Sequence, residues 1–351
     1  MGNIVKIVGL DLAKNSFHVF CADREGRLVE SKALRRAEVL PYFAKLAPCV
    51  VAMETCTGAN WWCRQIKEQG HDARLIPAAY VKPYVKSQKN DALDAEAICE
   101  AAQRPNMRYA PLKSESASAL LTMHRTRCAL IKQRTMSRNH VRAACAEFGL
   151  VERPGTKGFE RLASKLKEDG DDLPSTLRES QRQVLASIDR LTESAADLHA
   201  RICAWHRECE ASQRLEQIPG VGVLTATYLA AVLGDGSAYR NGRQFSASLG
   251  LVPRQLSTGG RQKLGGITKK GDATLRSLLC EGAISVLRHR LGGNGADFPG
   301  TTRRVEQKSM KCVAVALANR NARTAWAMIR HGTAYDPARQ HLGSGPTALV
   351  A

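Results

Sequence analysis

The chain has 351 residues, with 52 Lys or Arg against 33 Asp or Glu and a formal net charge of +19. A hydrophobic fraction of 44% and a mean hydropathy of −0.28 exclude a mostly disordered chain, and no apolar run approaches the ~20 residues that a membrane span needs. We therefore expect a cytoplasmic protein of about two domains, with no membrane segment and with a polyanionic partner.

The first third of the sequence predicts a layered α/β domain. Short apolar runs predict buried strands, and longer amphipathic runs predict helices between them. The order βββαβαβα indicates a sheet covered by helices. Strands are expected at 4–10, 17–20, 28–30, 49–54 and 73–76, and helices at 36–47, 61–69 and from about Asn90 onward.

The middle of the chain predicts long helices. From Val184 to Trp205, apolar residues recur at alternating spacings of four and three, which is the a/d seam of a coiled coil. The seam is compatible with packing inside one chain and with packing between subunits. Residues 152–180 are rich in Gly and Pro and predict a loop or flexible link between two helical arms.

A third part begins at the turn 218–222, Ile-Pro-Gly-Val-Gly, which resembles half of a helix-hairpin-helix element. Gly220 and Gly222 precede an apolar helix, where free backbone N–H groups and the positive end of the helix dipole suit a phosphate. An ordinary turn between two helices would have the same sequence. Further helices are expected at 223–233, 243–249, 273–290 and 303–331, with a Gly-rich basic loop at 253–272.

Positive charge gathers toward the C-terminus. Residues 236–351 hold 18 Lys and Arg against 5 Asp and Glu, which is +13 of the net +19. Within this part, Ser257 and Thr258 precede two glycines, and a hydroxyl among cations could attack a phosphodiester. A basic loop that only grips backbone phosphates would look similar. The cations around the two hydroxyls are Arg254, Arg261, Lys263, Lys269 and Lys270.

Four acidic residues in the first third could meet at one point. Asp11 follows the first strand, Glu54 ends the fourth, and Asp91 and Asp94 lie three residues apart on one helix face. Carboxylates gathered in this way repel one another unless a cation neutralises them, and Mg²⁺ or Mn²⁺ is the hard cation that oxygen ligands favour. As an alternative, the two helical aspartates are a helix cap and a first-turn charge.

The segments that carry these carboxylates resemble a known family. They are VGLDLAKNS, VVAMETCTGANWW and VKPYVKSQKNDALDAEAI, and they resemble the RuvC-like domain of Asp-Glu-Asp-Asp transposases. This is the bridge-RNA-guided insertion-sequence family to which the Piv-type invertases are related. The resemblance implies a ribonuclease-H-like fold, with catalytic, metal-binding roles for Asp11, Glu54, Asp91 and Asp94.

The segment 249–279 resembles the C-terminal transposase domain of the same family. The resemblance implies a catalytic serine that forms a covalent link to DNA. Ser257 is our first choice because a primary hydroxyl is less hindered, whereas an ungapped match from Pro253 favours Thr258. The resemblance also implies donor and target DNA, a structured guide RNA, a homo-oligomer (dimer or tetramer), a catalytic centre formed across domains, and a prokaryotic cytosol.

Together these features predict four parts. Residues 1–110 form a RuvC-like metal-binding domain, 111–210 a helical coiled-coil region, 211–335 a mostly α transposase domain, and 336–351 a disordered tail. The predicted function is a DNA transposase that cuts and rejoins strands through a serine assisted by a Mg²⁺ site. The alternatives are a metal-dependent junction-resolving endonuclease that uses water, and a nucleic-acid-binding protein without catalysis.

Overall fold

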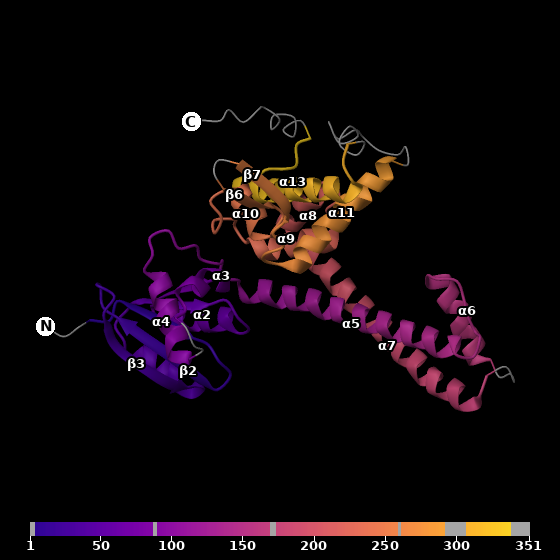
Figure 1. The fold of residues 1–351 in the computed structure, drawn as a ribbon, viewed down its shortest axis with the longest axis horizontal. Helices are drawn as coiled ribbons and strands as arrows, with labels where there is room; N and C mark the ends of the chain where they lie inside the picture. The colour runs from indigo at the N-terminus through magenta and orange to yellow at the C-terminus, as the bar shows by residue number, and fades with distance from the viewer. Residues whose placement is uncertain (1–3, 87–89, 169–172, 259–260, 292–306, 338–351) are drawn as a thin grey trace. The chain divides into compact units, whose positions relative to one another are not determined.

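The computed structural model describes residues 4–86, 90–168, 173–258, 261–291 and 307–337 (Figure 1). The chain divides into two compact units, residues 1–114 and 115–351. Among the described residues, no helix is both long enough and apolar enough to cross a membrane. All eleven cysteines are free thiols, and five of them are buried. The predicted tail falls largely outside the described residues, which end at position 337.

The first unit contains a five-stranded sheet in the order β3-β2-β1-β4-β5. β2 is antiparallel to both β1 and β3, whereas β4 is parallel to β1 and to β5. All five predicted strands are present, and the third is longer than expected. The strands are β1 (Ile7–Asp11), β2 (Ser16–Ala22), β3 (Leu28–Arg35), β4 (Val50–Glu54) and β5 (Asp72–Ile76).

Helices cover both faces of this sheet, which explains why hydrophobic alternation in the strands is weak. On one face, Leu10 and Val51 belong to a core that includes α2 (Ala59–Glu68), and α1 (Val39–Ala44) joins the same core. On the other face lies α4 (Asp91–Ala102), and a short turn of α3 (Ala78–Val81) and η2 (Lys82–Tyr84) follows β5. The expected α/β layering is therefore confirmed.

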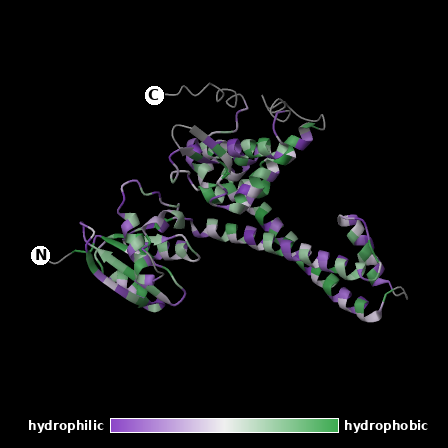
Figure 2. Ribbon diagram, in the orientation of Figure 1, coloured by the Kyte–Doolittle hydropathy of each residue, from purple (hydrophilic) through white to green (hydrophobic). Residues whose placement is uncertain are grey.

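The second unit starts with two long helices, α5 (Glu115–Ala146) and α7 (Ser175–Glu208), which pack against each other within the chain (Figure 1). Hydrophilic and hydrophobic residues alternate along both helices (Figure 2). In the heptad seam of α7, Ile188, Ala195 and Ile202 are buried. Part of the seam is thus used inside the chain, and an additional role between subunits stays a prediction.

The expected loop at 152–180 is wrong. Residues Thr156–Lys167 form helix α6, and α7 already begins at Ser175. Phe159 and Leu162 on α6 are buried against Leu185 and other residues of α5 and α7. The Gly and Pro residues around α6 mark its ends, and its amphipathic face provides the burial that stabilises a short helix.

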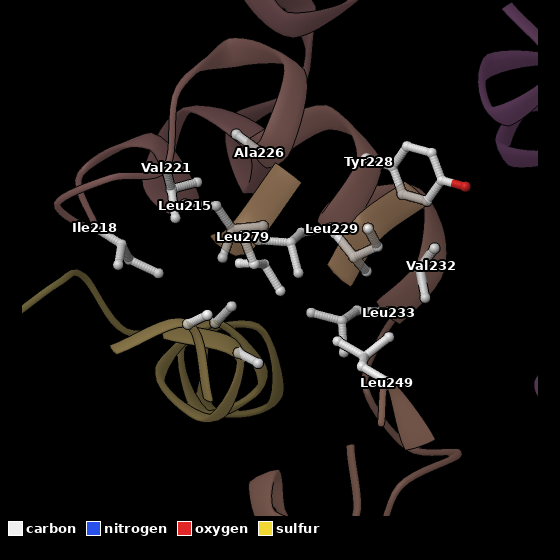
Figure 3. Packing of buried hydrophobic residues seen from close by; sticks show 14 of the residues in the cluster. Leu215, Ile218, Val221, Ala226, Tyr228, Leu229, Val232, Leu233, Leu249 and Leu279 are labelled. Atoms are coloured by element: carbon white, nitrogen blue, oxygen red, sulfur yellow. The ribbon is translucent and has the colours of Figure 1, made fainter. Parts of the chain in front are cut away.

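The rest of the second unit is a helical core built around α9 (Val223–Leu233), most of whose residues are buried. Figure 3 shows part of this core. Leu120 at the start of α5 and Ile202 near the end of α7 belong to the same core. The surrounding elements are α8 (Glu210–Glu216), α10 (Gly242–Ser248), α11 (Ala273–Leu291) and α13 (Met310–His331).

The expected basic loop at 253–272 is also wrong, because its first part forms an antiparallel hairpin. β6 (Pro253–Thr258) pairs with β7 (Arg261–Ile267). The two glycines between the strands, residues 259 and 260, lie outside the described residues, as do residues 292–306 at the start of the last expected helix.

Candidate metal centre

The sheet brings two of the four predicted carboxylates to one edge. β1 and β4 are parallel neighbours in which Leu10 lies opposite Met53, so Asp11 and Glu54 are the next residues on adjacent strands. Both strands run in the same direction, and their carboxyl ends therefore lie at the same edge of the sheet. Asp11 and Glu54 are both partly exposed there.

Helix α4 brings the other two carboxylates to this edge because it lies directly on β1. A Cβ atom on Gly9 would lie 2.1 Å from the carbonyl oxygen of Ala95 and 2.6 Å from the backbone nitrogen of Cys99. Only glycine permits this approach. Gly9 is a functional residue that was not predicted from the sequence, although a glycine inside a buried strand is a known sign that another backbone passes close by.

The first turn of α4 is capped by Asn90, whose Oδ1 accepts a hydrogen bond of 3.0 Å from the backbone N–H of Ala92. The alternative in which Asp91 caps the helix is therefore wrong, whereas the favourable first-turn charge is present, because Asp91 and Asp94 both lie in the first turn. Oxygen atoms of Asp11, Asp91 and Asp94 all lie within 4.8 Å of one another.

The electrostatics of this group favour a bound cation. Burial raises the pKa of Asp11 to about 6, and the charges of Asp94, Asp91 and Glu54 contribute to the same rise. Burial and the charge of Asp94 also raise the pKa of Glu54. Glu54 is not part of the close trio, but its charge contributes to the raised pKa of Asp11. Clustered carboxylate oxygens that repel one another fit a hard divalent cation such as Mg²⁺ or Mn²⁺.

The second predicted site, at the hairpin of the second unit, places its two hydroxyls on opposite faces. Ser257 and Thr258 are consecutive residues of β6, and successive side chains of a strand alternate between faces. On one face, Gln255 Nε2 donates a hydrogen bond of 2.9 Å to Ser257 Oγ. The other face carries Thr258 and Leu256, with Lys263 directly opposite Leu256.

The hairpin is anchored at its base and exposed along its length. Every side chain of β6 is exposed, including Leu256 at 71%. At the base, the backbone N–H of Lys269 bonds to the carbonyl oxygen of Gly250 at 3.2 Å, and Arg276 Nη1 bonds to the carbonyl oxygen of Leu249 at 3.0 Å. A two-stranded ribbon without a core is marginal by itself, so contact with a partner would stabilise it.

The structure describes the side chains of four of the five cations predicted for this region. Arg254 and Lys263 are exposed on the two strands, and Lys269 and Lys270 are exposed at the base of the hairpin. Arg261 lies opposite Thr258 in the backbone register, but its side chain is outside the described part of the structure. Their contact with phosphates stays a prediction.

The two predicted glycines of the 218–222 turn differ in their surroundings. Gly220 has a φ of +85°, and a Cβ atom there would lie 2.8 Å from the carbonyl oxygen of Gly282 on α11. The packing of the turn on α11 therefore requires this glycine. Gly222 is exposed at the N-cap position of α9, with open space where a side chain would be, so it remains a candidate for contact with a phosphate.

Comparisons with known proteins cover both sites. Residues 8–148 match the transposase family DEDD_Tnp_IS110, and residues 212–296 match the family described as Transposase IS116/IS110/IS902 family. A probable family 20 transposase of Pseudomonas aeruginosa is 43% identical over 332 residues, which is 94% of this chain and 98% of that protein.

Two further relatives are another transposase and a gene-inverting protein. The transposase for insertion sequence element IS1328 of Yersinia enterocolitica is 38% identical, over 94% of this chain and 98% of its own length. The pilin gene-inverting protein of Moraxella lacunata is 26% identical over 80% of each chain. The first matched stretch contains all four carboxylates, and the second contains the hairpin and the Gly-rich turn.

Proposed function

The chain belongs to the IS116/IS110/IS902 family of transposases and is an insertion-sequence transposase that acts on DNA; from this premise we propose that it uses a Mg²⁺ site and a serine hydroxyl. The observation that carries the proposal is the close trio of Asp11, Asp91 and Asp94, with oxygen atoms within 4.8 Å of one another. These residues hold the ion, and Glu54 adds negative charge beside them.

The ion supplies positive charge that stabilises the charge developing on a phosphate during strand cleavage. The chain's own residues determine where this happens. Gly9 lets α4 lie on β1, and Asn90 caps α4 so that the carboxylates of Asp91 and Asp94 are available to a ligand.

The proposed nucleophile is the hydroxyl of Ser257. Its Oγ forms a bond to a DNA phosphorus atom while one P–O bond of the DNA backbone breaks, and the hydroxyl proton ends on the departing DNA oxygen. The phosphodiester bond energy is retained in the link to Ser257, so a DNA hydroxyl can later reverse the step and rejoin a strand. The 2.9 Å hydrogen bond from Gln255 supports this choice because it fixes the position of the Ser257 oxygen.

Thr258 is the second candidate because its face of the hairpin also carries Lys263, and a nearby ammonium group stabilises negative charge on an attacking oxygen. Only one of the two hydroxyls can face a given phosphate, since they lie on opposite faces. The exposed ribbon and the excess of +13 in residues 236–351 support contact with nucleic acid of either kind.

We include a structured guide RNA and a homo-oligomer in the proposal. Both come from the family resemblance, and charge alone does not distinguish RNA from DNA. Both parts can be tested on the full chain purified from a host that carries the element. Sequencing of the bound RNA tests the guide, and light scattering tests the oligomer. One discrete RNA species and a mass of two or four chains are expected, whereas random RNA or a monomer would contradict these parts.

The central test is excision from a plasmid that carries the element, with a denaturing gel to detect protein covalently bound to DNA. We expect Asp11→Asn to abolish excision and Ser257→Ala to abolish both the adduct and excision, with Thr258→Val as the matched variant. Cleavage without any adduct in both hydroxyl variants would indicate a water-using endonuclease. Unchanged excision in Asp11→Asn would remove the metal site from the mechanism.

A further inference from the structure

An open pocket of about 430 Å³ lies beside the metal centre and shares Glu54 with it. Its other lining residues are Ala78, Lys82 and Val85, which come from the α3–η2 turn and the residue after it. This turn follows the carboxyl end of β5, the parallel neighbour of β4. The pocket therefore lies at the same edge of the sheet as the four carboxylates.

Lys82 is the feature that suggests a ligand. Its side chain is exposed, and among the residues that the structure describes no carboxylate oxygen lies within 4.0 Å of its ammonium group, that of Glu54 included. Lys86, four residues later, differs because it forms an ion pair of 2.9 Å with Glu96. An ammonium group that lines a pocket but is not paired with the pocket's own carboxylate is available to an anion.

The remaining wall is apolar. Val85 is 39% exposed, and Ala78, which lines the same pocket, is also exposed. A volume of about 430 Å³ lies within the range of small-ligand sites, and a single nucleotide fits such a space. The pocket thus combines a cation for a phosphate, an apolar surface for a sugar or base, and a direct border with the proposed metal site.

We propose that this pocket binds the nucleotide next to the scissile phosphate of the DNA strand, with Lys82 contacting a backbone phosphate and Val85 contacting the sugar or base. The inference rests on the proposed metal site, since it assumes that DNA is cut beside Asp11 and Glu54. It adds a direct phosphate contact in the first unit, whereas the direct phosphate contacts predicted from the sequence all lie in the second unit.

The test measures binding of the full-length protein to a fluorescent 20-nucleotide oligothymidylate in Mg²⁺, between 50 and 300 mM NaCl. Loss of one phosphate contact from a single strand lowers the slope of log affinity against log salt by about 0.7. We expect this decrease in Lys82→Ala and recovery in Lys82→Arg. Lys86→Ala is the matched control, because it removes the same charge from the same segment without altering the pocket, and we expect it to keep the wild-type slope.

A second variant tests the apolar wall without a change of charge. Val85→Phe fills the pocket from an exposed position, so we expect it to fold and to reduce excision at least 10-fold. An equal slope for Lys82→Ala and Lys86→Ala would overturn the phosphate contact. Wild-type excision in Val85→Phe would overturn the nucleotide pocket.

The binding readout separates this inference from the proposed function. If Asp11→Asn keeps excision while Lys82→Ala still lowers the salt slope, the metal mechanism fails and the phosphate contact stands. If Asp11→Asn abolishes excision while Lys82→Ala behaves like Lys86→Ala, the metal mechanism stands and the pocket inference fails.

Discussion

Gly9 on β1 and Ala95 on α4 lie so close that a Cβ atom on Gly9 would be 2.1 Å from the Ala95 carbonyl oxygen. This contact determines how closely α4 approaches the sheet. It therefore also sets the distance from Asp91 and Asp94 to Asp11, because these two aspartates occupy the first turn of the same helix.

The first prediction follows from this contact. Gly9→Ala forces α4 away from β1, so we expect a loss of about 1–3 kcal/mol in the free energy of unfolding together with at least 10-fold weaker Mn²⁺ binding. Chemical denaturation and calorimetric Mn²⁺ titration measure the two effects. Gly70→Ala is the control, because Gly70 has open space around it and only the cost of a positive φ. It should lose stability and keep its Mn²⁺ affinity, and equal affinities in both variants would contradict the contact's role.

The second prediction concerns stability without metal. The pKa of Asp11 is raised to about 6, so the folded state favours the protonated carboxyl over the charged one. The stability that this preference contributes at low pH is therefore lost as the pH rises from about 4 through 6. Asp11→Asn removes the repulsion. At pH 7 in EDTA we expect the variant to unfold at a higher temperature. We expect its free energy of unfolding to rise by only about 1 kcal/mol, because Asp11 is partly exposed and solvent screens much of the repulsion.

The same experiment with Mg²⁺ should reverse the order. The ion binds only the folded wild-type site and raises its unfolding temperature, whereas Asp11→Asn lacks one of the three ligands. Thermal unfolding at pH 5 and pH 7, with and without Mg²⁺, checks both statements. A variant that is less stable than the wild type in EDTA at pH 7 would show that the carboxylates do not repel one another as described.

The third prediction is the pH dependence of metal binding. The ion requires the ionised form of Asp11, so Mn²⁺ affinity should fall as pH drops through about 6, well above the ordinary range of an aspartate. Glu54→Gln removes one of the charges that raise this pKa, and it should shift the midpoint to lower pH. A midpoint near pH 4 in the wild type, or no shift in Glu54→Gln, would count against this electrostatic description.

The fourth prediction distinguishes the two hydroxyls. Gln255 donates a hydrogen bond to Ser257 and lies on the face opposite Thr258. If Ser257 attacks, Gln255→Ala should slow adduct formation by about fivefold, the value of one hydrogen bond of ~1 kcal/mol, with unchanged DNA affinity. Time courses on denaturing gels measure the rate. If Gln255→Ala leaves the rate of adduct formation unchanged and Thr258→Val abolishes the adduct, Thr258 is the nucleophile.

The strands and most helices could be predicted because their signals are local. Apolar runs and heptad spacing come from residues near one another in the chain, and they correctly indicated the α/β layering and the long helices. The prediction failed at 152–180 and at 253–272, where Gly and Pro residues indicated loops. There, burial of Phe159 and the pairing of β6 with β7 outweighed local preference.

The sequence by itself determined which residues are candidates for the chemistry: four carboxylates in a recognisable order, two hydroxyls before a pair of glycines, and a net charge of +13 in the last third. Only the tertiary structure decided how these groups meet. Asp11 and Asp91 lie far apart along the chain, and the packing of α4 on Gly9 brings them together. The extended conformation of β6 likewise places the side chains of Ser257 and Thr258 on opposite faces, and the turn after β5 brings Lys82 to the same pocket as Glu54. Hydrophobic periodicity indicates which face of a helix or strand is buried, whereas distances between remote residues depend on how closely backbones pack.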